Sequence, residues 1–249
     1  MKLTVVGCSG SVPGPEAATS CYLVEYDGFR LVLDLGHGSL GVLQQFIDIP
    51  DIDAIAISHL HTDHWIDLTT LHVAVRYGPY DIAGRVPIFG PVATADRLAD
   101  AYGIDRSPGL HATFDFQDIS MTTAIGPFRI RTARMAHPID AYAIRLDAGG
   151  HSLVYSGDTG PCRELVELAD GVDLLLAEAS CVDGLDNPPD LHMTGKEAGT
   201  IAREAAVAQL VVTHVPPWNS RQLALDEARS AFAGTVTLAA PGWSVDLSR

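Results

Sequence analysis

The sequence predicts an α/β fold in which two β-sheets are covered by helices. Short apolar runs rich in β-branched residues recur along the chain and end at Gly, Pro or Asp, which is typical of buried strands. Helical patterns fall between some of these runs, more often in the second half of the chain. Because the first half has mostly strand-to-strand connections, this mixture favours two sheets over one doubly wound sheet.

The predicted elements follow from these runs and from local start signals. Strands are predicted at 3–7, 21–26, 30–34, 53–57, 127–133, 141–146, 152–156, 172–176, 210–213 and 235–238, and helices at 39–46, 66–76, 92–101, 161–169, 195–207 and 220–232. Thr194 and Glu197 have the spacing of a capping box, so a helix is expected to begin just after Thr194. Pro161 is predicted to occupy the first position of the helix at 161–169.

The chain is strongly acidic and long enough to bury a sizeable core. It has 249 residues, 47% of them hydrophobic, and we expect one domain spanning 1–249. Asp and Glu outnumber Lys and Arg by 31 to 16, which gives a formal charge of −15. A surface of this sign repels polyphosphate over long distances, which argues against a nucleic-acid partner.

The sequence also carries expectations about cellular location. The N-terminal segment lacks a long apolar region followed by a small-residue cleavage site, so no signal peptide is expected. No stretch approaches about 18 uninterrupted apolar residues, so no membrane partner is expected either. We therefore expect a cytoplasmic protein. Its widely spaced cysteines are expected to be reduced and packed rather than to bind metal: Cys8, Cys21, Cys162 and Cys181.

Three histidines and an aspartate follow directly on a predicted buried strand. In an extended chain alternate side chains share a side, so His59, His61 and Asp63 are expected to point together. Leu60 would then turn into the core, and His64 would point elsewhere unless the chain has already turned. Two differently directed ligand sets from one loop suit two neighbouring metal ions. Imidazole and carboxylate ligands favour zinc, with iron and manganese as alternatives.

Three further candidates for metal ligands lie where predicted strands end. These are His137, Asp158 and His214, and strand ends are the positions from which layered α/β folds present ligands on one edge. Each has an ordinary structural alternative. The two histidines could be packed strand-end residues, and Asp158 could cap a helix.

Taken in order, these motifs resemble the metallo-β-lactamase fold superfamily of binuclear hydrolases. They are HxHxDH at 59–64, a lone histidine at 137, SGDT at 156–159 and THVPP at 213–217. This resemblance implies a four-layer αββα sandwich. GCSGSVP at 7–13, AEAS at 177–180 and LHMT at 191–194 resemble the phosphodiesterase branch that includes ribonuclease Z. PPDLH at 188–192 and THVPPW at 213–218 look similar to actinobacterial cyclic-nucleotide phosphodiesterases.

The resemblance also implies a role for each of these residues. Of the ligands, His59, His61 and His137 would bind the first metal, Asp63, His64 and His214 the second, and Asp158 would bridge both. A hydroxide between the metals would attack the substrate, and Asp63 would help to orient it. His192, positioned by Glu178, would contact the phosphate and protonate the leaving oxygen. The remaining histidines have no place in the motif, with His37 the best placed to line the site: His37, His72, His111 and His151.

Two observations move the predicted substrate from tRNA to something small. His137 and Asp158 are only 21 positions apart, which leaves no room for the tRNA-gripping arm that long-armed ribonuclease Z inserts there. The acidic charge also disfavours tRNA. We therefore predict a cyclic nucleotide, 3′,5′-cyclic AMP first, with aromatic faces for the base among Trp218, Tyr77 and Tyr80.

Other activities stay open at this stage. The same metal platform could serve a ribonuclease Z-like tRNA 3′-endonuclease, or a hydrolase of a lactone, thioester or β-lactam. A non-catalytic relative that binds a nucleotide or a protein on a dead site is the alternative from another class. The resemblance also implies a homodimer.

Overall fold

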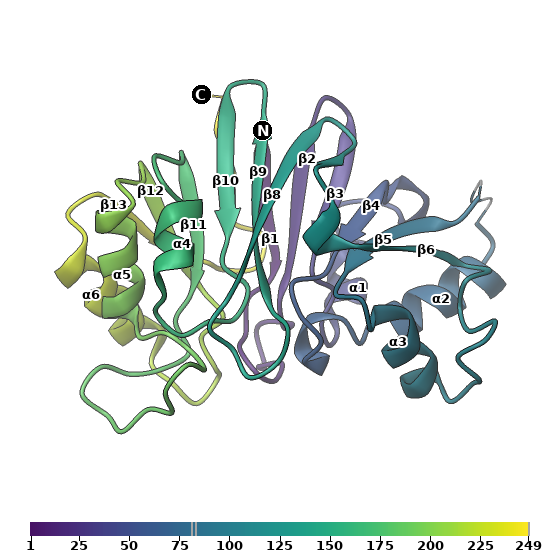
Figure 1. Cartoon of the computed structure of the whole chain (residues 1–249), viewed down its shortest axis with the longest axis horizontal. Coiled ribbons are helices and arrows are strands. Elements are labelled where there is room, and N and C mark those ends of the chain that lie inside the picture. The colour runs from purple at the N-terminus through teal and green to yellow at the C-terminus, as the bar shows by residue number, and fades with distance from the viewer. Residues whose placement is uncertain (81, 83, 249) are drawn as a thin grey trace.

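Two β-sheets pack against each other at the centre of the fold (Figure 1). The computed structural model describes residues 1–80, 82 and 84–248. Within these residues, the first sheet has the order β14-β1-β2-β3-β4-β5-β6. Its strands are β1 (Lys2–Gly7), β2 (Cys21–Tyr26), β3 (Phe29–Leu33), β4 (Ala54–Ala56), β5 (Val86–Gly90), β6 (Phe114–Asp118) and β14 (Ser244–Asp246).

The second sheet has the order β13-β12-β11-β10-β9-β8-β7. Its strands are β7 (Ala124–Ile125), β8 (Phe128–Arg134), β9 (Tyr142–Ala148), β10 (His151–Tyr155), β11 (Leu174–Glu178), β12 (Gln209–Thr213) and β13 (Thr235–Leu238). Strands β10 to β13 run parallel to one another, while β7 to β10 are antiparallel neighbours. The second sheet is therefore mixed. The first sheet is mixed as well, since β14, β1, β2 and β3 are antiparallel neighbours and β3 to β6 are parallel.

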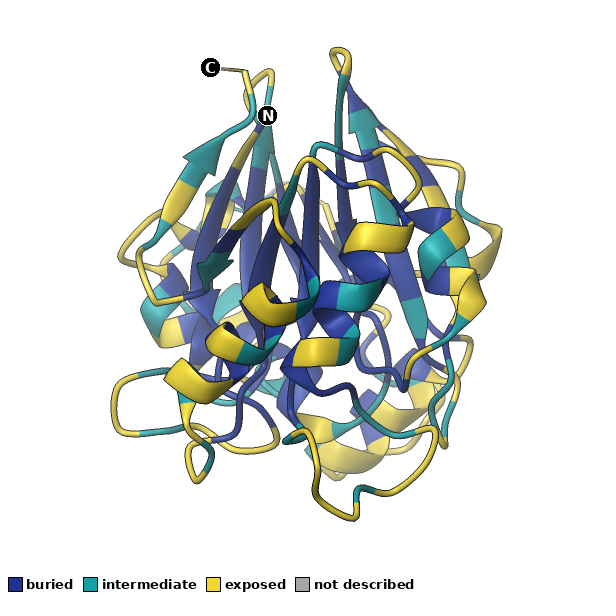
Figure 2. Cartoon of the chain, turned by 90° about the vertical axis from the view of Figure 1, so that its left-hand side faces the viewer, coloured by how far each residue is buried: buried dark blue, intermediate teal, exposed yellow. Residues whose placement is uncertain are grey.

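Helices cover the outer side of each sheet and complete four layers (Figure 1). They are α1 (Ser39–Leu43), α2 (Leu68–Tyr77) and α3 (Thr94–Tyr102) on the first sheet, and α4 (Arg163–Leu168), α5 (Gly195–Glu204) and α6 (Arg221–Ala231) on the second. Figure 2 faces the second set and shows exposed outer helix surfaces in front of largely buried strands. Among the described residues, no helix has the length and apolar character needed to cross a bilayer.

Side-chain alternation along the strands divides the apolar residues among three clusters. In β10, Leu153 and Tyr155 enter the cluster between the sheets, whereas Val154 joins the cluster beneath α4, α5 and α6. In β11, Leu174 likewise faces between the sheets and Leu175 faces the helices. A third cluster lies between the first sheet and helices α1 to α3. Because such strands are buried on both faces, they appear in the sequence as continuous apolar runs.

The two predicted helix starts have different outcomes. The capping box is confirmed, since the Thr194 side chain accepts from the Glu197 backbone N–H and the Glu197 side chain accepts from the Thr194 backbone N–H. The prediction for Pro161 is wrong, because α4 begins at Arg163. The preceding residue, Cys162, has an extended backbone and forms the N-cap, so Pro161 lies in the loop.

The expected elements of the first half also need correction. Strands β5 and β6 were not among the predicted strands, yet they extend the first sheet in parallel with β4, with α2 and α3 as the crossovers. Pro87 interrupts the apolar run of β5, and Asp115 and Gln117 alternate with phenylalanines in β6. Neither strand therefore resembles the short buried runs that marked the others.

Candidate metal centre

The residues singled out from the sequence converge on one end of the two sheets. The loop after β4 carries His59 to His64, and the segments after β8, β10 and β12 carry His137, Asp158 and His214. The two sheets are joined here by a bridge between His59 and Ala141. Ligand atoms from distant parts of the chain are thus brought within 4.8 Å of one another in two overlapping groups that share Asp158. A third group joins Asp158 to Glu178 and His192.

The first group, called here the tri-histidine set, consists of His59, His61 and His137 with Asp158. The Nε2 atoms of His59 and His137 lie 3.2 and 3.0 Å from the Nδ1 atom of His61. Asp158 Oδ2 lies 3.6 Å from His59 Nε2. His59 is fully buried, whereas His61 and His137 are partly exposed, so this group opens towards solvent.

The second group, called here the buried set, consists of Asp63, His64 and His214 with Asp158. All of its members are buried. The Nε2 atom of His64 lies 3.2 Å from Asp158 and 3.4 Å from Asp63. The Nε2 atom of His214 lies 3.3 and 3.6 Å from the same two carboxylates. Asp158 therefore faces both groups, with Oδ2 towards the first and both oxygens towards the second.

The grouping of Asp63 corrects the expectation from strand alternation. Residues Thr62–His64 form a 3-10 turn rather than an extended segment. Alternation therefore ends at His61, and the turn directs Asp63 towards His64 and His214 instead of towards His59. Leu60 does turn away, packing against the cluster beneath α1 to α3.

The donor atoms of the cluster fit divalent metal ions. Four of them are buried without a hydrogen-bond partner among the described residues: Asp63 Oδ2, His64 Nε2, Asp158 Oδ1 and His214 Nε2. Buried polar atoms in folded proteins are almost always satisfied, so four such atoms converging on one point need a further partner. Imidazole nitrogens and carboxylate oxygens at this spacing are ligands that zinc and related ions accept.

The electrostatic environments of the two groups differ. Burial lowers the pKa of His59, His61 and His137, so these imidazoles are neutral and offer lone pairs. Burial acts in the same direction on His64, but three carboxylates, from Asp158, Asp34 and Asp63, overcome it and hold its pKa well above the usual value. The buried set is therefore a site of strong negative potential.

An ionisable pair, Glu178 and His192, borders the cluster. Glu178 is fully buried at the end of β11 and accepts hydrogen bonds from the backbone N–H groups of Thr159 and Ser180. His192 Nδ1 donates to Glu178 Oε1 at 2.8 Å, and its side chain is 16% exposed. Burial lowers the pKa of His192, but the Glu178 carboxylate outweighs this effect and raises it to about 9. His192 is therefore an imidazolium at neutral pH.

Several hydrogen-bonding residues around the ligands were not found from the sequence. They are Asp34, Ser58 and Tyr155, which form one network beside His59 and His64, and Ser20, whose hydroxyl contacts His214 Nδ1 at 2.8 Å. One signal was present for Asp34, because it ends the apolar run 30–34 as the ligands end theirs. The other three are common polar residues, and no residue pattern marks them.

The remaining candidates lie outside both groups. His72 is buried against Thr113, with its Nδ1 atom 2.7 Å from the hydroxyl. His37, His111 and His151 belong to neither metal-ligand group. The described cysteines are free, and none enters a group. Trp218 is 66% exposed and lies four residues after His214, and its contact with a substrate stays a prediction.

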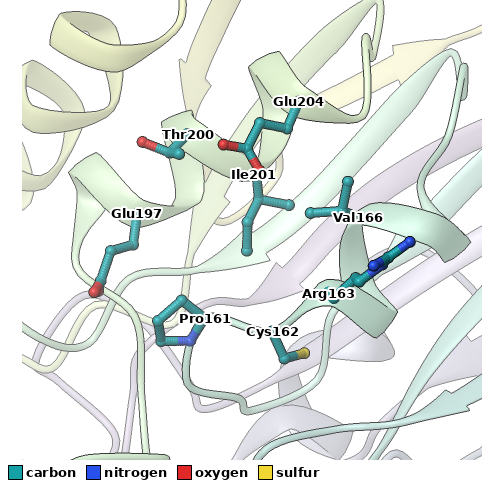
Figure 3. Close-up of a pocket in the computed structure, with 8 residues that line it drawn as sticks. All are labelled: Pro161, Cys162, Arg163, Val166, Glu197, Thr200, Ile201 and Glu204. Atoms are coloured by element: carbon teal, nitrogen blue, oxygen red, sulfur yellow. The ribbon is translucent and has the colours of Figure 1, made fainter.

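A separate hollow of about 530 Å³ lies between α4 and α5 (Figure 3). Its lining consists of Pro161, Cys162, Arg163, Val166, Glu197, Thr200, Ile201 and Glu204. None of the clustered histidines or aspartates contributes to it. This hollow belongs to the outer helical layer and is distinct from the metal centre.

Comparison with known proteins places this architecture in a family. The sequence matches the Beta-lactamase superfamily domain over residues 32–215. An uncharacterized protein of Mycobacterium tuberculosis is 42% identical over 243 residues, covering 95% of this chain and 88% of that protein. The probable metallo-hydrolase YhfI of Bacillus subtilis is 31% identical over 245 residues, covering 98% of each. A ribonuclease Z of Metallosphaera sedula is 27% identical over 281 residues, covering 93% of this chain and 94% of that protein.

The structural comparison agrees with the sequence match. The crystal structure of YhfI has a TM-score of 0.86 to this chain at 29% identity, with 98% of both chains covered. The chain therefore belongs to the beta-lactamase superfamily, and the predicted α/β fold of two helix-covered sheets is confirmed. It is a metal-dependent hydrolase with ribonuclease Z-like relatives. The matched segment contains every member of the two ligand groups.

Proposed function

We propose that the chain is a binuclear metal-dependent phosphodiesterase that hydrolyses a small phosphodiester, with 3′,5′-cyclic AMP as the first candidate. The observation that supports this is the His192–Glu178 ion pair beside Asp158. An imidazolium at the edge of the cluster attracts an anionic substrate and can give a proton to a leaving alkoxide. Hydrolysis of a phosphodiester needs both of these functions.

The two ligand groups would hold one divalent ion each, with Asp158 between them. Zinc is the ion we propose, because histidine nitrogens dominate the donor set. Two ions bound there would supply an activated water and would neutralise charge on the phosphoryl oxygens. The chain's own contribution is to fix the ligands and to place Asp63 and His192 around the substrate.

In the proposed reaction, a water oxygen forms a bond to phosphorus as the bond from phosphorus to O3′ breaks. Asp63, whose Oδ2 has no other hydrogen-bond partner, accepts a hydrogen bond from the attacking water and orients it. His192 gives the proton of Nε2 to the departing O3′, because its Nδ1–H is held by Glu178. Cyclic AMP would thereby become 5′-AMP: the water leaves its hydroxyl on the phosphate, O3′ keeps the proton from His192, and the proton released by the water restores the imidazolium of His192.

Two features of the chain favour a small substrate rather than tRNA. Between His137 and Asp158, the chain forms little more than the hairpin of β9 and β10. Exposed basic side chains are already paired with carboxylates in many places, for example Lys2 with Glu25, Arg106 with Asp100 and Lys196 with Asp183. Paired cations contribute little to phosphate-backbone binding, which depends on releasing counterions from the nucleic acid.

The test is a hydrolysis panel with zinc- and manganese-loaded protein. Cyclic nucleotides, dinucleotides, a precursor tRNA, and chromogenic ester and β-lactam substrates are compared under the same conditions. We expect turnover of cyclic AMP to 5′-AMP. Asp158→Ala should lower kcat by at least about 1000-fold, since it removes a ligand shared by both groups. His111→Ala, an exposed histidine outside the cluster, is the matched control and should retain activity.

The other activities are distinct outcomes of the same panel. Cleavage of precursor tRNA without turnover of cyclic nucleotides would assign the chain to the ribonuclease Z activity of its relative. Turnover of the ester or β-lactam alone would show a different bond specificity. Loss of all hydrolysis despite full metal loading would support a binding protein. Each of these three results would refute the cyclic-nucleotide proposal.

A further inference from the structure

A buried carboxylate outside the ligand groups contacts one of them directly and reaches the other through a serine hydroxyl. Asp34 follows β3, is fully buried, and belongs to neither metal-ligand group. Its φ of 57° lies in the left-handed region, which an L-residue other than glycine adopts at a cost. Strained, buried carboxylates of this kind persist where the surrounding structure requires them, so the partners of Asp34 define its role.

Four donors surround the Asp34 carboxylate. Oδ1 accepts from the backbone N–H of Ser58 at 2.7 Å. Oδ2 accepts from the Ser58 hydroxyl at 2.8 Å, from His64 Nδ1 at 2.6 Å and from the Tyr155 hydroxyl at 2.7 Å. Oδ2 is therefore saturated by donors, and the carboxylate belongs to neither ligand group.

The hydrogens in this network can be assigned by counting. A carboxylate can only accept, so His64 Nδ1 must carry a hydrogen, and Nε2 is the nitrogen that can give up its proton and present a lone pair to a cation. The Ser58 hydroxyl has one hydrogen and donates it to Asp34. Its oxygen lies 3.1 Å from His59 Nδ1, so that nitrogen must be the donor in the contact. His59 therefore also carries its hydrogen on Nδ1 and its lone pair on Nε2.

These two lone pairs point into different groups. His59 Nε2 faces His61 and Asp158 in the tri-histidine set, and His64 Nε2 faces Asp63 and Asp158 in the buried set. We infer that Asp34 is a positioning residue for both metal positions at once, acting directly on His64 and through the Ser58 hydroxyl on His59. It fixes each imidazole in the tautomer that can bind a cation.

The other two Nδ1 contacts of the cluster show what is particular to Asp34. His137 Nδ1 lies 2.9 Å from the carbonyl oxygen of Leu191, and His214 Nδ1 lies 2.8 Å from the Ser20 hydroxyl. Each of those partners is neutral and serves one ligand. Ser20 and Ser58 thus form a matched pair of fully buried serines, because each contacts the Nδ1 of one histidine in a different group.

The experiment separates the two metal positions before the network is changed. His61→Ala disables the tri-histidine set and leaves the buried set, and His214→Ala does the reverse. In each background, the Zn²⁺ affinity is measured by competition with a chromophoric chelator. The visible spectrum of the Co²⁺ form reports the ligand geometry. No substrate is present, so failure of the proposed phosphodiesterase activity would leave this test intact.

Asp34→Asn should weaken Zn²⁺ binding about 10- to 100-fold in both backgrounds and should change both Co²⁺ spectra. Ser58→Ala should weaken binding only in the His214→Ala background, where the tri-histidine set remains. Ser20→Ala should weaken binding only in the His61→Ala background. In this crossed pattern, each serine variant weakens Zn²⁺ binding in one background and not in the other. A merely structural role for these residues would lower the unfolding midpoint without producing it.

Three results would overturn the inference. One is an effect of Asp34→Asn confined to the His61→Ala background, because Asp34 would then serve His64 alone. Another is an equal effect of Ser58→Ala in both backgrounds. The third is unchanged affinity and unchanged spectra in every variant. If Asp34→Asn does not fold, the Ser58→Ala and Ser20→Ala variants still test the inference. Absence of the crossed pattern in their Zn²⁺ affinities would refute the role of the Ser58 hydroxyl.

Discussion

The tri-histidine set and the buried set share Asp158 but are built in different ways. In the tri-histidine set, the Nδ1 atoms of His59 and His137 contact a hydroxyl and a backbone carbonyl, both of them neutral, and two members of the set are partly exposed. The buried set places His64 among the carboxylates of Asp34, Asp63 and Asp158, with no member exposed. One half therefore opens to solvent, while the other is held within the protein by charge and packing.

This difference indicates a division of labour within one centre. A buried group surrounded by carboxylates retains a cation through charge, because cations are strongly attracted to anionic sites of low dielectric. The more open group offers neutral lone pairs next to His192, where the proposed substrate would bind. The contrast can be tested first through stability, then through pH dependence, and finally through backbone packing.

The largest difference should appear when one histidine is removed from each half of the metal-free protein. His64→Ala leaves three buried carboxylates without their positive partner, and breaking such a buried pair costs about 3 to 5 kcal/mol. His61→Ala removes a partly exposed, neutral side chain and should cost less than about 1 kcal/mol. Urea unfolding in the presence of a chelator measures both. Equal losses would show that the two halves do not differ in this way.

The next effect concerns His192 on the open side of the cluster. His192 must be protonated to act as an acid, and its pKa of about 9 keeps it so at neutral pH. Glu178→Gln removes the carboxylate that raises this pKa, while burial still lowers it. Activity that depends on the imidazolium is present below the pKa and lost above it. The basic limb of the pH profile should therefore move to lower pH.

The size of this change follows from the titration itself. Each pH unit above a pKa lowers the protonated fraction about tenfold, so Glu178→Gln should lower kcat/KM roughly tenfold or more at pH 8. The loss should be smaller at pH 6. Glu167→Gln, on an exposed residue of α4, serves as the matched control. A basic limb at the same pH in Glu178→Gln and the parent would contradict the assignment of His192 as the acid.

Much of this arrangement could be predicted from the sequence because ligands and buried strands leave local patterns. Strand-end positions gave His137, Asp158 and His214 as candidates, and the structure brings all three to the same cluster as His59 and His64. The two-sheet fold followed from apolar runs of strand length. Strands β5 and β6 were missed because Pro87 and the polar residues of β6 break the apolar pattern.

What the sequence could not show depends on contacts between distant residues. Tyr155 and Asp34 are 121 positions apart, and Ser20 and His214 are 194 apart, yet each pair is hydrogen-bonded. No local pattern distinguishes these residues from other buried polar side chains. Strand alternation also could not show the turn at Thr62–His64, so it placed Asp63 on the side of His59. The family resemblance had instead grouped Asp63 with His64 and His214, as the structure does.

The smallest effect tests how tightly the backbone supports the buried set. A Cβ at Gly36 would lie 1.8 Å from the carbonyl oxygen of Asp63, so Gly36→Ala must displace that backbone. Overpacking of this kind costs about 1 to 3 kcal/mol. Gly41→Ala is the matched control, because its Cβ meets nothing within 4 Å and alanine favours helix α1 by about 0.5 to 1 kcal/mol. We therefore expect Gly36→Ala to lower the unfolding midpoint and Gly41→Ala to raise it. An unchanged unfolding midpoint in Gly36→Ala would mean that the backbone at Asp63 is free to move. The buried set would then not be held more firmly than the tri-histidine set.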